Sequence, residues 1–243
     1  MAVLLGVDSV LETVILTTSQ TWTPPVDGTG IIHVIGAGAS GGGDANNRAG
    51  GAGGYSRKAV TFATGTNWTI VVGAGGTPTA TNQAEAAGGN STATDGSSSL
   101  TANGAPNLAG GSASGGDVNF TGGSGGQNIT GGGGAVGVFA NGSTTNSDSG
   151  GQTTDANGGA DSFLVLGLGQ LIGGSGGSSG GGNGGFLSGG GNSFFGGSSY
   201  ASFWGGKGGI GGGGGSGFQN TTSSRAGGAG GDGLVVIQYL TVT

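Results

Sequence analysis

The chain has 243 residues, of which 69 are glycine and only 7% are charged, and its formal net charge is −6. It contains no cysteine, so disulfides and thiolate metal sites are excluded. Its five basic residues are scattered and form no basic stripe that could contact phosphates, which argues against a nucleic-acid partner.

The N-terminal part of the chain reads as β-structure. Alternating runs rich in branched and aromatic residues predict strands at 12–19, 21–23, 31–35, 55–62 and 67–72, and a last one at 234–240. The C-terminal strand needs a partner, and pairing with the N-terminal strands would close the base of the molecule. No segment shows helical periodicity. A 33% share of hydrophobic residues favours an ordered chain over the disorder that such a glycine content often signals.

Many glycines recur with a period of three residues, for example at 173–178, 205–213 and 227–232. Three residues per turn is the period of the polyproline-II helix, which makes no internal hydrogen bonds. A Gly-Gly-X helix has two bare faces, so neighbouring helices can approach closely and bond backbone to backbone. With only four prolines and a broken register, collagen is excluded.

These patterns predict a mostly irregular, all-β fold with no α-helix of note. A small β-sheet base is expected from 1–76, to which the C-terminal strand at 233–243 returns. Residues 77–232 are expected to form a bundle of polyglycine-II helices that carries variable loops.

Motifs for catalysis are weak. Gly36, Gly38 and Gly41 form a Gly-x-Gly-x-x-Gly after a strand, but no helix follows, and such a match is expected by chance among so many glycines. The single histidine, His33, alternates within a strand and is interpreted as structural. The acidic residues are dispersed singly. We therefore expect no enzyme, no cofactor and no metal site, and neither a secretory signal nor a membrane span.

The most distinctive insert is 186–204, where seven large apolar residues lie between glycine runs that cannot bury them. Aromatic residues on loops are favoured binding anchors. Alternatively, these loops cap the bundle and form a small apolar core there. The sequence supports the two interpretations equally. The candidate binding residues are Phe139, Phe186, Phe194, Phe195, Tyr200, Phe203 and Trp204.

Glycine rods alternating with glycine-poor loops over about 73–233 resemble the tip adhesins of the long tail fibres of T-even-like bacteriophages. The segments 21–25, 31–36, 54–58, 68–76 and 233–239 also resemble the glycine-rich domain of phage fibre proteins. The resemblance implies a polyglycine-II sandwich in the virion, extracellular after release, whose loops bind an outer-membrane protein or a surface glycan. By position, that role falls on the loops around Phe139, Phe194, Phe195, Tyr200 and Trp204.

The resemblance also implies other tail-fibre proteins as partners, or copies of the chain itself, as in a homotrimer. The chain differs from the tip adhesins in one respect: those adhesins carry a larger attachment domain before the glycine region. Two other interpretations remain. One is a structural fibre or decoration subunit without a receptor role, and the other is an ice-binding protein, against which the long irregular inserts argue.

Overall fold

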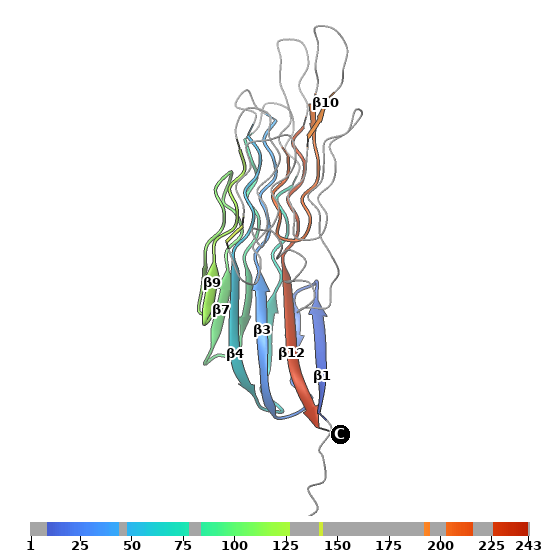
Figure 1. Ribbon diagram of the computed structural model, residues 1–243, viewed down its shortest axis with the longest axis vertical. Helices are drawn as coiled ribbons and strands as arrows, with labels where there is room; N and C mark the ends of the chain where they lie inside the picture. The colour runs from blue at the N-terminus through green and yellow to red at the C-terminus, as the bar shows by residue number, and fades with distance from the viewer. Residues whose placement is uncertain are drawn as a thin grey trace, which may run out of the picture.

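The computed structural model describes residues 9–43, 48–77, 84–126, 141–142, 192–194, 203–215 and 226–242. In these residues every regular element is a β-strand, which confirms the prediction of an all-β chain. Figure 1 shows two parts arranged along the long axis, with long strands at one end and undulating extended segments beyond them. We call the first part the base and the second the glycine bundle.

The base contains two antiparallel sheets, which we call sheet A and sheet B, each with five strands. Sheet A has the spatial order β1 (Ser9–Leu16), β12 (Leu234–Val242), β3 (Gly28–Ile35), β4 (Tyr55–Phe62) and β9 (Val118–Phe120). Sheet B has the order β2 (Gln20–Trp22), β5 (Trp68–Val71), β6 (Ser91–Thr94), β7 (Ser99–Ala102) and β8 (Ala113–Ser114). A separate pair is formed by β10 (Asn192–Phe194) and β11 (Phe203–Gly205).

The C-terminal strand lies where the sequence predicted it. Strand β12 pairs with β1 on one side, from Ser9 opposite Val242 to Leu16 opposite Val235, and with β3 on the other. The two ends of the chain are thereby joined in one sheet. This closure explains how a glycine-rich middle segment can project from a single compact base.

The apolar core lies between the two sheets. Alternate residues of sheet A, including Ile32 and Ile237, are fully buried against Trp68 and Leu100 of sheet B. Phe62 contacts Trp68 edge-on, with ring centroids 5.9 Å apart. Strands with period-two alternation can therefore bury a side chain at every second position, whereas the glycine segments cannot.

The two parts interleave along the chain, which differs from the predicted division into 1–76 and 77–232. Strands β6, β7, β8 and β9 all lie between 91 and 120 and belong to the base. Conversely, glycine segments within the first 76 residues belong to the bundle. Strands β6 to β9 fall within 77–232, the part predicted as rods and loops, yet Leu100 and Ala102 complete the core of the base.

The glycine bundle has the three-residue period that the sequence predicted. Segment 36–42 shows it best, because seven successive amides donate to three neighbouring segments in rotation. Gly36, Ala39 and Gly42 donate to the carbonyls of Gly54, Gly51 and Arg48. Ala37 and Ser40 donate to Gly89 and Ala86, and Gly38 and Gly41 donate to Gly231 and Gly228. We call each such segment a rod.

Three more rods donate to this central rod from other directions. The carbonyls of Ala37, Gly38 and Ala39 accept from the amides of Ala105, Gly76 and Gly214, respectively. The central rod is thus bonded to six others, and it is buried along its described length. Nearly all of these contacts join backbone atoms. The stability of the bundle therefore depends on how closely the rods approach one another and little on the identity of their side chains.

Glycine is required where two rods touch. At Gly38 an added Cβ would overlap the carbonyl group of Gly212, and at Gly53 it would overlap the carbonyl group of Gly36. Both obstacles are backbone atoms that cannot rotate away. In contrast, Ala37 and Ala39 are accommodated in the same rod with no exposure. The three-residue glycine repeat therefore reflects direct contact between backbones.

His33 is buried in sheet A, as expected for a structural histidine. Its Nε2 lies 3.3 Å from Gln238 Oε1, which can only accept, so Nε2 donates and Nδ1 accepts from the Tyr55 hydroxyl 2.7 Å away. Burial, together with a smaller effect of the Arg57 charge, lowers the pKa of His33 from 6.5 to about 4, and the hydrogen bond to Gln238 opposes this shift. The ring is therefore neutral at pH 7.

This burial predicts acid sensitivity. Between the ordinary histidine pKa of 6.5 and the folded value of about 4, the unfolded chain binds a proton that the folded chain does not. The free energy of unfolding should therefore fall as the pH is lowered through this window, by about 3 kcal/mol in total. Urea unfolding of the protein and of His33→Gln across this range measures it. The variant should have a shallower dependence, and equal slopes would contradict the assignment.

Candidate functional site

The candidate site lies at the end of the glycine bundle that is farthest from the base. The rods are direct continuations of strands: β3 continues into 36–43, β5 continues into 72–77, and 226–233 lead back into β12. The described chain ends that flank 44–47, 78–83 and 216–225 consequently all lie at this far end. The connections themselves lie outside the described residues.

Strands β10 and β11 bring three of the seven candidate residues together. The antiparallel register places Phe194 opposite Phe203 and Ser193 opposite Trp204. Strand β11 leads into Gly206, whose carbonyl accepts from Gly215 within the bundle. Figure 1 shows β10 beside the far ends of the rods, at the end of the molecule opposite to the C-terminal end of β12. The pairing anchors this aromatic segment on the scaffold, and we call it the aromatic strand pair.

The other four candidates, Phe139, Phe186, Phe195 and Tyr200, lie outside the described residues. Phe195 and Tyr200 fall within the segment 195–202 that joins β10 to β11 in the sequence. Strand pairing brings Phe194, Phe203 and Trp204 together, and their role in binding stays a prediction.

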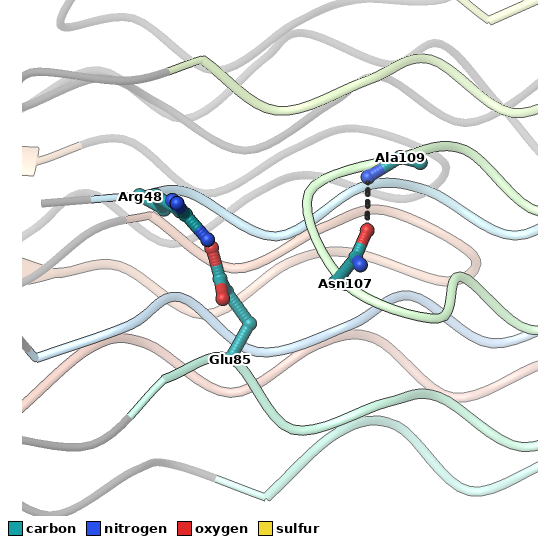
Figure 2. Close-up of polar contacts among 4 residues, drawn as sticks. All are labelled: Arg48, Glu85, Asn107 and Ala109. Carbon is teal, nitrogen blue, oxygen red and sulfur yellow. Dashed lines mark hydrogen bonds and ion pairs between the residues drawn. The ribbon is translucent and has the colours of Figure 1, made fainter. Parts of the chain in front are cut away.

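An ion pair near the far end joins two rods, and sequence reasoning missed it. Arg48 begins the rod at 48–54, Glu85 lies at the start of the rod at 84–90, and Figure 2 shows their side chains directed toward each other. Arg48 Nε lies 4.0 Å from Glu85 Oε1, and the two side chains are 37% and 3% exposed. These two atoms have no hydrogen-bond partner in the structure as described. The residues are 37 positions apart, and only the packing of the rods brings them together.

The pair predicts a stability effect at the far end. Removing the guanidinium in Arg48→Ala leaves the buried Glu85 carboxylate without its counter-charge, which should cost about 2 kcal/mol. Adding Glu85→Gln to that variant should restore most of the loss, because the remaining side chain is neutral. Chemical unfolding of the single and double variants measures both. A single variant as stable as the parent would contradict the role of the pair.

A short loop at the side of the bundle connects two extended segments. At 106–109, Asn107 Oδ1 accepts from the Ala109 amide at 2.8 Å, as Figure 2 shows. Its carbonyl accepts from Gly51. Asparagine stabilises such a turn through its own side chain, so the chain can reverse here without a large insert.

The described residues include no group of three or more histidine, cysteine, aspartate or glutamate side chains that could hold a metal ion. The amides of Gly36, Gly38 and Gly41 in the Gly-x-Gly-x-x-Gly stretch donate to Gly54, Gly231 and Gly228 and so do not point to a phosphate. The arrangement can instead present side chains and loops from a rigid scaffold.

Comparison with known families gives one match, to the family described as glycine-rich domain, over residues 14–240. The chain belongs to this family. The match extends from β1 to β12, so the glycine-rich domain includes both the base and the bundle. No curated protein matches the chain. The described part of this glycine-rich domain contains no helix that could cross a membrane.

Proposed function

We propose that this protein is a receptor-binding adhesin of a bacteriophage tail fibre, located in the virion and recognising a bacterial outer-membrane protein or surface glycan. The observation that carries the proposal is the aromatic strand pair at the end of a backbone-bonded scaffold. Binding surfaces are often loops held by a rigid framework, and aromatic side chains are common anchors of such surfaces.

The physical argument begins with the scaffold. Because the rods bond through backbone atoms, residues at the far end can vary without removing the contacts that hold the bundle together. The base and the far end are also separated along the long axis (Figure 1). One end is therefore free to bind a fibre while the other meets a cell, which is the arrangement an adhesin requires.

A second candidate function is a structural fibre or decoration subunit without a receptor role. It is favoured by exposed apolar side chains on the base, among them Leu11 and Leu240, which are 59% and 47% exposed. Exposed apolar clusters usually mark protein interfaces. Such a subunit would bury these residues against neighbours in the virion and would need no contact with a cell.

The two functions are separated by labelling bacteria with the purified fluorescent protein. The panel includes strains that lack single outer-membrane proteins or lipopolysaccharide sugars. An adhesin labels some strains and loses that labelling in one receptor mutant. If the folded protein labels no strain, the adhesin proposal fails and the structural role takes its place.

A further inference from the structure

The base carries an exposed apolar surface on the face of sheet A that points away from sheet B. Leu11 and Leu240 are direct neighbours across β1 and β12, and Ile15 lies on the same face four residues further along β1. Their exposed fractions are 59%, 47% and 46%. Ile31 of β3 lies on the same face and is 37% exposed. We call these four residues the base patch.

The base patch adjoins an open sheet edge. Among the described strands, β1 pairs only with β12, so the backbone groups on its other side are not used by the sheet. The strand is eight residues long, pairs without a bulge, and has Glu12 as its one charged residue. Natural proteins normally protect such an edge with lysine, proline, a bulge or a cover. This edge therefore has the properties of a pairing surface.

The order of residues in β1 determines how a second copy of the chain could pair with this edge. If a second copy adds its own β1 in antiparallel orientation, a two-fold axis perpendicular to the sheet keeps both outer faces on the same side. One residue must then lie opposite its own copy, with the axis midway between the two. If that residue is Glu12, two carboxylates are opposed, which is unfavourable. If it is Thr13, Leu11 lies opposite Ile15 of the other copy, twice, and the base patch extends across both copies.

We propose that two copies of this chain associate through β1, with Thr13 opposite its own copy across the two-fold axis. The two five-stranded sheets A become one continuous sheet. Leu11 and Leu240 of one copy continue on the outer face into Ile15 of the other. The two glycine bundles then point in opposite directions, so their far ends lie on opposite sides of the dimer. This inference does not depend on the proposed receptor-binding role.

The absence of cysteine from the chain permits a direct test with single-cysteine variants. Thr13→Cys is expected to form a disulfide-linked dimer under mild oxidation, because directly opposed residues have Cβ atoms about 5 Å apart. Leu11→Cys is the matched control, since its two copies would lie about 13 Å apart. Mixing Leu11→Cys with Ile15→Cys should restore cross-linking between the two variants.

Sedimentation velocity over a range of concentrations provides the second measurement. The parent protein should dimerise reversibly, and Leu11→Lys with Ile15→Lys should raise the dissociation constant at least about tenfold by opposing like charges. Val71→Lys, at an exposed site on sheet B, should leave it unchanged. A monomer at all concentrations, a trimer, or equal cross-linking of Thr13→Cys and Leu11→Cys would overturn the proposal.

Discussion

Gly38→Ala should destabilise the protein by about 4 kcal/mol, although it adds only one methyl group. The new Cβ would overlap the carbonyl group of Gly212, and the two rods would have to separate. Overpacking of this kind typically costs a few kcal/mol. Separation would also weaken neighbouring backbone bonds, such as those from Gly38 to Gly231 and from Gly214 to Ala39, each contributing about 1 kcal/mol.

The control is the reverse change at the adjacent position. Ala39 is fully buried in the same rod and already has a Cβ, so Ala39→Gly removes a methyl group without creating a clash. It should cost about 1 kcal/mol through lost contacts and greater backbone entropy in the unfolded state. Chemical unfolding of both variants measures the difference. Equal losses for the two changes would mean that the rods do not meet as closely as described.

Replacing Phe194, Phe203 and Trp204 together with alanine should weaken binding to a susceptible cell at least about 100-fold. Phe194 and Phe203 are opposed in the register of β10 and β11, and Trp204 follows Phe203, so the change removes all three aromatic residues of the strand pair. Single aromatic anchors at interfaces often contribute about 2 kcal/mol or more when truncated to alanine. Titration of labelled protein against cells measures the loss.

The matched control for this variant is Val71→Ala. Val71 is 40% exposed on sheet B in the base and is therefore apolar and accessible, but remote from the far end. It should bind cells like the parent protein. The triple variant must also retain the parent unfolding transition, which shows that the scaffold is intact. Unchanged binding by a folded triple variant would assign recognition to other residues.

The base could be predicted from the sequence because its longer strands carry local patterns typical of β-structure. Segment 68–71 buries every second residue, whereas 31–35 is dominated by branched residues and is buried from Ile32 to Ile35. Both patterns are visible without knowledge of the partner strand. The short strands β6 to β9 escaped this reasoning. All four are short, and β6 to β8 are rich in Ser, Thr and Ala. Only their place beside Trp68 and Ile70 makes Leu100 a core residue.

The bundle could be predicted as a class but not as an arrangement. The three-residue glycine repeat indicates that the rods are joined by backbone hydrogen bonds, yet it does not predict which rods are neighbours. Glycine provides no side chain to distinguish one neighbour from another, so pairs such as Arg48 and Glu85 emerge only from the packing. For the aromatic residues, sequence could predict their clustering, whereas the pairing of Phe194 with Phe203 required the structure.

The claim on which both the fold and the proposed function depend is that 36–42 form a rod bonded to neighbours in every direction. Native-state hydrogen exchange resolved by residue tests it most directly. All seven amides donate to other rods, so they should exchange only through global unfolding, as slowly as amides of β3. Exchange as fast as that of the exposed turn at 95–98 would contradict the account.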